Sequence, residues 1–474
     1  MREWELVLAP ETDGPRYLAI AEAIREDIVR GRLRADQKLP GARSLAMQIG
    51  VHRNTVTAAY AELEQEGWIR TEPARGRFVQ PVQRQRITTR AGIAERVPYR
   101  LGAAPPKLVQ AVDAPYDLAG GMPDARLYPS DALGRAYRRV LGRHGKHWLS
   151  YGDPQGNPRL RASIAKLLAE TRGLAVDADD VFITRGSQMA LWLIGQTLLS
   201  PGDLVAVESF GYRPAWDALR AHGAELEPIS VDGSGMNLTQ LEALCEETPP
   251  RAIYLTPHHQ YPTTVALSAP RRVALLALAR RHRIAVIEDD YDHELHYEGR
   301  PILPMATLDT GGNVLYIGTL SKVLAPGIRV GWVVAPAPVL DRLVRWRLMV
   351  DRQGDLAVEA AIAELMEEGE LQRHVFRMRK IYASRRNALL AEVERQLPIV
   401  SLTPPRGGMS LWGNARGVDV ETWKANAATL GVRIRTARDF AFDGRPRAQL
   451  RLGFARLDEA QLAEAVRRLA KALP

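Results

Sequence analysis

Hydrophobic side chains recur at helical spacing near the start of the chain. Between Pro15 and Gly31 they form an apolar stripe of Leu18, Ile20, Ala21, Ile24 and Ile28. Residues three and four positions apart lie on one face of a helix, so the stripe predicts an amphipathic helix over 15–30. Proline is favoured at the start of a helix and glycine just past its end, and both stand at those positions here.

Two more short helices and a hairpin are predicted directly afterwards. The first helix covers 40–50 (PGARSLAMQIG) and ends at a glycine. The second covers 51–67 (VHRNTVTAAYAELEQEG), with its packing side formed by Val56, Ala59, Tyr60 and Leu63. Two short helices joined by a glycine-containing turn are typical of a helix-turn-helix motif. The segment 67–80 (GWIRTEPARGRFVQ) then predicts two strands around a turn, a wing with Arg75 and Arg77 at its tip.

The pattern changes after residue 115. Short β-branched runs alternate with amphipathic helices such as 271–282, which predicts an α/β fold. The runs predicted as strands are 180–186, 204–209, 252–257, 284–290 and 313–319. We therefore expect a helix-turn-helix domain over 12–80 and an α/β domain over 116–474. The segment 81–115 between them is basic, rich in proline and alanine and without apolar period, and is predicted to be a linker.

Composition narrows the class of protein. The chain has 474 residues, of which 46% are hydrophobic and 25% charged, as in ordinary globular proteins. No apolar run reaches the ~18 residues of a membrane helix. We see no secretory signal at the N-terminus, and the single cysteine, Cys245, cannot form an intrachain disulfide. These features favour a cytoplasmic protein.

The position of the charged residues along the chain is more informative than the net charge of +9. Residues 30–60 contain six basic side chains and one acidic one, an excess of 6 − 1 = +5: Arg30, Arg32, Arg34, Lys38, Arg43 and Arg53 against Asp36. In a helix-turn-helix motif, the N-terminal end of the second helix faces the bases. That end carries donors and acceptors for bases and phosphates: His52, Arg53, Asn54, Thr55 and Thr57. A solvated polar face is the other interpretation, but the wing and the local charge favour DNA binding.

The second candidate site lies in the α/β part. Pyridoxal chemistry needs a lysine for a Schiff base, a carboxylate against the pyridinium nitrogen and a cradle for a phosphate. Lys322 and, at the end of a predicted strand, Asp289 supply the first two. The cradle is predicted from a strand-to-helix turn and a later loop: Gly186, Ser187, Gln188, Thr319, Ser321 and Arg329. No metal site is predicted.

The N-terminal part resembles the GntR family of winged-helix regulators. The matching segments are LPGARSLA, VHRNTVTAAYAELEQEGWI and ARGRFV. The resemblance implies that Arg43 and Arg53 contact phosphate or base, and that Thr55 and Gly76 lie close to the DNA backbone. Gly41 stands where the family usually has a capping serine, and glycine is an acceptable cap. The expected DNA-contacting set is Arg43, Arg53, Asn54, Thr55, Thr57, Arg75 and Gly76.

The rest of the chain resembles fold-type I aminotransferases over 116–474, and the whole chain resembles the MocR/GabR family of regulators. The segments that carry this likeness are LYPSDALGRAYRRVL, YGDPQGNPRLRASIA, TRGSQMAL, TPHHQYPTT, IEDDYDHE, GTLSKVLAPGIRVGW and LRLGFA. The resemblance implies that Lys322 forms the Schiff base and Asp289 pairs with the ring nitrogen. It also implies that Tyr291 bonds the phenolic oxygen, that Tyr212 stacks on the ring and that Arg451 grips a ligand carboxylate.

Three positions leave alternatives open. Asp290 replaces Asp289 as the carboxylate if the strand register slips by one residue. Thr264 stands where true aminotransferases have glycine, and Gln260 or Tyr261 faces the phenolic oxygen where they have a different residue.

The leading functional hypothesis is a regulator whose DNA binding responds to pyridoxal 5'-phosphate or to an amino compound at the cofactor. The alternatives are a working aminotransferase with an accessory DNA-binding domain, and a repressor with a silent aminotransferase scaffold. The resemblance further implies a homodimer with DNA-binding heads exchanged between protomers.

Overall fold

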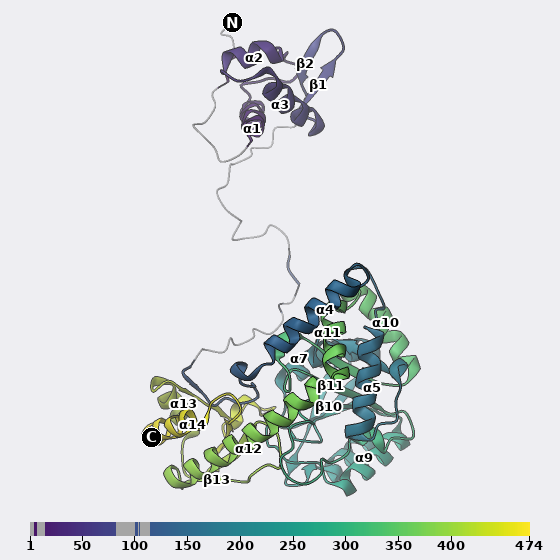
Figure 1. Ribbon diagram of the computed structural model, residues 1–474, viewed down its shortest axis with the longest axis vertical. Helices are drawn as coiled ribbons and strands as arrows, with labels where there is room; N and C mark the ends of the chain where they lie inside the picture. The colour runs from purple at the N-terminus through teal and green to yellow at the C-terminus, as the bar shows by residue number, and fades with distance from the viewer. Residues whose placement is uncertain (1–3, 7–14, 82–99, 103, 105–113) are drawn as a thin grey trace. The chain divides into compact units, whose positions relative to one another are not determined.

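The computed structural model describes residues 4–6, 15–81, 100–102, 104 and 114–474, which form two compact units, 1–104 and 105–474. The predicted linker over 81–115 falls largely outside the described residues. Figure 1 shows the helices and strands of each unit.

The N-terminal unit has three helices and a hairpin, as the sequence predicts. The helices are α1 (Arg16–Val29), α2 (Ala42–Gln48) and α3 (Arg53–Gln65), and the hairpin pairs β1 (Ile69–Glu72) with β2 (Gly76–Val79) in antiparallel register. The side chain of His52 caps α3 by accepting a hydrogen bond from the backbone N–H of Asn54. The helices pack on Tyr60, whose hydroxyl donates to the Pro40 carbonyl at 2.8 Å.

One position of the predicted stripe is wrong. Leu18 is 41% exposed, whereas the other stripe residues, Ile20, Ala21, Ile24 and Ile28, are buried. In the first turn of α1, fewer side chains are therefore buried than the spacing of the apolar residues predicted. Tyr17 and Trp4 pack against the core instead, and the Trp4 indole N–H donates to Asp27 at 2.8 Å.

The larger unit is built around a seven-stranded sheet with strand order β4-β12-β11-β10-β9-β5-β6. All neighbouring pairs are parallel except those of β12, which is antiparallel to both its neighbours. The strands are β4 (Val181–Thr184), β5 (Leu204–Glu208), β6 (Glu225–Ile229), β9 (Ala252–Leu255), β10 (Ala285–Asp290), β11 (Val314–Thr319) and β12 (Gly331–Val334). All five predicted strands are present, with ends close to those expected.

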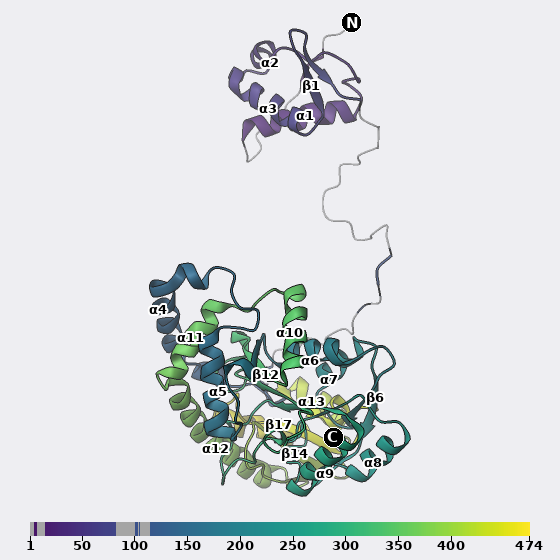
Figure 2. The same cartoon turned by 90° about the vertical axis from the view of Figure 1, so that its right-hand side faces the viewer.

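Helices cover both faces of this sheet. Because successive side chains of a strand point to opposite faces, Ile287 packs with one group of helices and Val286 with the other. The first group is α6 (Ser187–Leu198), α7 (Arg213–Arg220) and α10 (Ala337–Val350). The second is α8 (Leu238–Glu247) and α9 (Ala269–His282). Near them lie the short hairpin β7 (Val231–Asp232) and β8 (Gly235–Met236). In both views α4 (Ser130–Trp148) and α11 (Leu356–Glu367) run side by side, and α5 (Pro158–Arg172) packs on α11 (Figures 1 and 2).

A smaller antiparallel sheet follows near the C-terminus, and it carries Arg451. Its order is β13 (Val400–Leu402), β14 (Ser410–Ala415), β17 (Gln449–Gly453) and β16 (Arg435–Thr436). Three helices accompany it, α12 (Glu370–Gln396), α13 (Val420–Thr429) and α14 (Glu459–Lys471). The short β3 (Tyr116–Asp117) pairs with β15 (Val432–Arg433), which ties the start of the larger unit to its end. Among the described residues, no helix is long and apolar enough to span a membrane.

The core of the N-terminal unit generates a stability prediction. Leu63 is fully buried, so Leu63→Ala is expected to lower the free energy of unfolding of this unit by about 2–5 kcal/mol. Peptide-resolved hydrogen exchange on α1 and α3 in the full chain measures that loss. Leu18→Ala is the matched control and should change protection by less than about 1 kcal/mol. Equal losses in the two variants would contradict the packing described here.

Candidate functional site

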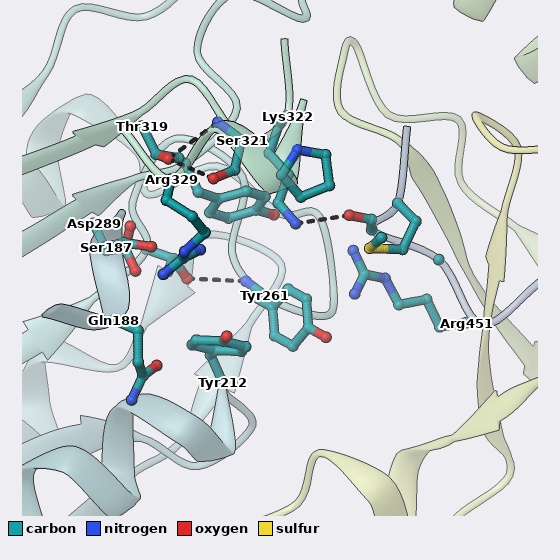
Figure 3. A pocket seen from close by; sticks show the side chains of 16 residues that line it. Ser187, Gln188, Tyr212, Tyr261, Asp289, Thr319, Ser321, Lys322, Arg329 and Arg451 are labelled. Atoms are coloured by element: carbon teal, nitrogen blue, oxygen red, sulfur yellow. Dashed lines mark hydrogen bonds between the residues drawn. The ribbon is translucent and has the colours of Figure 1, made fainter. Parts of the chain in front are cut away.

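A cavity of about 290 Å³ lies where strands of the large sheet end (Figure 3). Around it the structure brings together ten residues that the sequence singled out in this part of the chain: Ser187, Gln188, Tyr212, Asp289, Tyr291, Thr319, Ser321, Lys322, Arg329 and Arg451. Ligand sites of α/β proteins are expected at the carboxyl ends of the strands, and β10 and β11 deliver Asp289 and Thr319 there.

Lys322 follows β11 on a short loop and projects into this cavity. Its Nζ donates a hydrogen bond to the Gly121 carbonyl at 2.7 Å. Burial, with a contribution from the neighbouring Arg451 guanidinium, lowers the pKa of Lys322 to about 8. A lowered pKa increases the neutral amine fraction near pH 7, and the neutral amine is the form that attacks a carbonyl.

Asp289, at the end of β10, faces the cavity with one oxygen lacking a partner. The Tyr254 hydroxyl donates to Oδ2 at 3.0 Å, while Oδ1 is buried with no hydrogen-bond partner. Burial raises the pKa of Asp289 to about 7. A protonated ring nitrogen at this position would supply the missing donor and the opposite charge.

The structure separates Asp289 from its alternative, Asp290. Asp290 is on the opposite side of β10, where it accepts from the Tyr316 hydroxyl at 2.7 Å and lies 3.7 Å from Arg172 Nε. Asp290 Oδ2 is also 2.9 Å from a ring nitrogen of His293, and these surroundings hold the pKa of Asp290 well below its usual range. The strand register therefore places Asp289, and not Asp290, at the cavity.

Asp290 and His293, together with His258, form a buried cluster whose ligand atoms lie within 4.8 Å of one another. The Tyr316 hydroxyl already occupies an Asp290 oxygen, and the Arg172 guanidinium beside it disfavours a second cation. We interpret the polar contacts within this cluster as contacts that stabilise the position of β10.

The N-terminus of α6 provides the expected anion cradle. Gly186 has φ +76° before the first helical residue, Ser187. A side chain at Gly186 would lie 3.1 Å from the Arg329 guanidinium, so the turn and the arginine fit closely only with glycine there. The first N–H groups of a helix have no intrahelical partner and bind phosphate readily.

Two residues of the cradle donate side-chain hydrogen bonds to other groups of the protein. The Thr319 hydroxyl donates to Ser321 Oγ at 3.0 Å, which fixes the position of that side chain. The side-chain amide of Gln188 donates to the Pro214 carbonyl at 2.8 Å. Gln188 therefore helps to hold α7 against α6.

Aromatic side chains shape the remaining wall. Tyr212 and Tyr261 make an edge-to-face contact with ring centroids 5.6 Å apart. The Tyr291 hydroxyl donates to the His259 carbonyl at 3.0 Å. Tyr261 lines the cavity, whereas the Gln260 amide is turned away to the Phe210 carbonyl at 2.7 Å, which distinguishes the two alternatives left open by the sequence.

Arg451 is 2% exposed and has unmet hydrogen-bonding capacity. Its Nε and Nη1 have no hydrogen-bond partner, and its Cζ lies 4.2 Å from the centre of the Tyr261 ring. A buried guanidinium left in this state is costly, and a carboxylate would satisfy it with paired hydrogen bonds.

The sequence analysis missed part of the wall: Gly120, Gly121, Met122, Thr256 and Pro326. Gly120 has φ +84°, and a side chain there would come within 2.5 Å of Ser410 Oγ. The paired glycines of LAGGMPD were the available signal, because such a pair often marks close approach of the backbone to another group. The aldehyde-reactive lysine, the unpaired carboxylate oxygen and the anion cradle together fit pyridoxal 5'-phosphate.

The predicted DNA-contacting residues form an exposed polar surface on the smaller unit. Arg43 lies in the first turn of α2, and Arg53, Asn54 and Thr57 project from the first turns of α3, all exposed. Thr55, in the same turn, is half-buried.

The wing agrees with the prediction at one arginine and corrects it at the other. Arg75 is exposed at the turn before Gly76, 2.5 Å from Glu72. Arg77 is not at the tip: it lies within β2 and stacks on the Tyr60 ring, with Cζ 5.0 Å from the ring centre. The second strand already begins at Gly76, so Arg77 pairs with Thr71 in the hairpin and lies outside the turn.

Comparisons with known proteins match both units. Residues 16–79 match the family of bacterial regulatory proteins of the gntR type, and residues 122–469 match aminotransferase class I and II. The probable rhizopine catabolism regulatory protein MocR of Rhizobium meliloti is 30% identical, over 98% of this chain and 95% of its own length. The HTH-type transcriptional regulator TauR of Rhodobacter capsulatus is 31% identical over 98% of each chain.

A solved structure agrees with the larger unit. The α-aminoadipate aminotransferase LysN of Thermus thermophilus, complexed with N-(5'-phosphopyridoxyl)-L-leucine, has 31% identity and a TM-score of 0.70, covering 75% of this chain and 91% of LysN. Regulators match the full length of the chain, whereas this enzyme matches the larger unit alone. The chain therefore belongs to the MocR/GabR family of transcription regulators, in which a GntR-type DNA-binding domain is joined to an aminotransferase-like domain for pyridoxal 5'-phosphate.

Proposed function

We propose that DNA binding by this regulator responds to an amino compound that enters the cavity at Lys322. The observation that carries the proposal is Arg451, a buried guanidinium at the cavity with two nitrogens lacking partners. A structural arginine would be paired, whereas a carboxylate-binding arginine is completed by its ligand. In a second form of this proposal, the signal is pyridoxal 5'-phosphate itself.

Different cavity residues would bind different groups of the cofactor. When bound, pyridoxal 5'-phosphate supplies an aldehyde and an electron-withdrawing ring. Lys322 would bind the aldehyde carbon, and Asp289 would keep a proton on the ring nitrogen. Tyr291 would bond the phenolic oxygen, and Tyr212 would pack against the ring.

The phosphate would be bound at the α6 N-terminus. Ser187, Ser321 and Arg329 offer two hydroxyls and a guanidinium there, and all three line the cavity. Thr319 and Gln188 position these groups through their bonds to Ser321 and to α7.

An aminotransferase would use the same cavity, since Lys322 could also shuttle a proton. Thr264 distinguishes this chain from those enzymes. It has φ +63°, a conformation that favours glycine and that costs a β-branched residue on the order of 1 kcal/mol. Thr264 therefore adopts a glycine-like backbone conformation at the position where the resemblance places a glycine in those enzymes.

The test combines an absorption spectrum with a DNA-shift assay on the region upstream of the chain's own gene. Wild type should show a visible cofactor band that changes when amines are added, with a parallel change in DNA affinity. Lys322→Ala should lose the band and the response to amines, while Asn387→Ala, at an exposed position outside the cavity lining, should keep both. Turnover of many amino acids with no DNA shift would support the aminotransferase instead, and absence of a band in wild type would support a silent scaffold.

The exposed set on α2, α3 and the wing is proposed to contact DNA. Arg53, at the start of α3, is expected to contribute most directly, and Asn54, Thr55 and Thr57 lie in the same turns. Arg43, Arg75 and Gly76 would face the flanking phosphates.

Arg53→Ala should weaken DNA binding by about 1–3 kcal/mol, roughly 5- to 150-fold at fixed salt. Arg30→Ala removes the same charge from the end of α1, where Glu26 already pairs with it at 2.8 Å, and should have a much smaller effect. Titration at constant ionic strength measures both. Equal effects would mean that α3 contributes only general charge.

A homodimer with exchanged heads is the assembly we propose. Large apolar side chains are exposed on two adjoining segments, with Leu149 74% and Met349 77% exposed. The segments are joined by a hydrogen bond of 2.7 Å from the Gly152 N–H to Gln353. Two copies would place two winged helices on two half-sites.

Burial of that surface makes the dimer sensitive to charge. Met349→Asp is expected to shift sedimentation from dimer to monomer, because the new carboxylate would be desolvated in the interface. Phe376→Asp, at a 58% exposed position on α12, serves as the control and should stay dimeric. A wild-type chain that sediments as a monomer would refute the assembly.

A further inference from the structure

A second arginine faces Arg451 across the small sheet. The register of β16 and β17 places Arg435 directly opposite Arg451. Directly opposed residues of an antiparallel pair project from the same face and lie close together. Two guanidinium groups therefore share the face of the small sheet that closes the cavity at Arg451.

Both guanidiniums rest on the same two aromatic rings. Arg451 Cζ lies 4.2 Å from the centre of the Tyr261 ring, and Arg435 Nη1 donates to the Tyr261 hydroxyl at 3.3 Å. Arg435 Cζ lies 4.2 Å from the centre of the Phe440 ring, and Arg451 Cζ lies 5.9 Å from it. Tyr261 lines the cavity, so Arg435 sits one aromatic ring away from the ligand space.

No carboxylate among the described residues makes an ion pair with either arginine. The nearest candidate, Asp439, accepts from Lys424 at 2.7 Å and from the Thr436 N–H at 2.9 Å, and Arg435 reaches only its backbone carbonyl. Like charges directly opposed on a sheet destabilise it, and burial of one of them adds to the cost. A single guanidinium suffices to bind one carboxylate through paired hydrogen bonds.

We propose that the effector is an amino compound with two carboxylates, one bound by Arg451 and the other by Arg435. This inference rests on the proposed function and adds the chemical class of the ligand. Arg435 is then the residue that separates acidic from neutral amino compounds, since only the second carboxylate would give it an ion-pair partner.

Calorimetry on the cofactor-loaded full chain tests this with two pairs of ligands, L-glutamate against L-glutamine and L-aspartate against L-asparagine. Each pair differs chiefly in one negative charge. At least one acid should bind about tenfold or more tightly than its amide. Arg435→Gln should reduce that preference to within about threefold, by weakening the acid and not the amide, and Arg435→Lys should fall between. Arg438→Gln removes the same charge from an exposed neighbouring position and should keep the preference.

The outcomes separate the two proposals. Equal binding of acid and amide by wild type overturns the second carboxylate and leaves amine sensing in place. Equal weakening of acid and amide by Arg435→Gln would show that Arg435 only packs against Phe440, and also overturns the inference. Binding of none of the four ligands contradicts the amine-sensing proposal together with this one.

Discussion

Removing a charged side chain from water without an opposite charge is among the costliest things a folded chain does, and the larger domain does it repeatedly around one cavity. Among the described residues, Asp289, Lys322 and Arg451 have no ion-pair partner within the protein, although all three line the same space. The shifted pKa values of Asp289 and Lys322 follow from this. In the function proposed above, a cofactor and its ligand supply the missing charges, so that ligand binding changes the energy of the domain.

On the opposite face of β10 the carboxylate does have charged neighbours within the protein, although Asp290 Oδ1 makes no hydrogen bond. Asp290 accepts from Tyr316 and lies beside Arg172, which in turn pairs with Glu294. Two adjacent aspartates thus have opposite roles because a strand alternates its side chains. The neighbours of Asp290 lie within the protein, whereas the proposed partner of Asp289 is the ring nitrogen of the cofactor.

Much of this could be predicted from the sequence, and the failures have physical reasons. Strand ends and helix spans followed from apolar periodicity, and the order of Asp289 and Lys322 followed from the chemistry of the cofactor. The predicted burial of Leu18 was wrong because the periodicity of apolar residues does not show at which turn a helix stops packing against the core. The prediction for Arg77 was wrong because the sequence does not show where the turn ends and the second strand begins, and Arg77 lies within that strand against Tyr60. The role proposed for Arg435 could not be predicted from the sequence, because it depends on the position of Arg435 opposite Arg451 in the neighbouring strand.

In the proposed function, the cavity and the DNA-binding head are energetically coupled. Coupling between two binding sites is reciprocal, so DNA must change the affinity for the amine by the same factor as the amine changes the affinity for DNA. The most direct measurement is the affinity of the cofactor-loaded chain for its amine with and without saturating operator DNA. We predict a change of roughly 5- to 150-fold, equal to the change seen in the converse titration. Identical amine affinities in the two conditions would contradict the account.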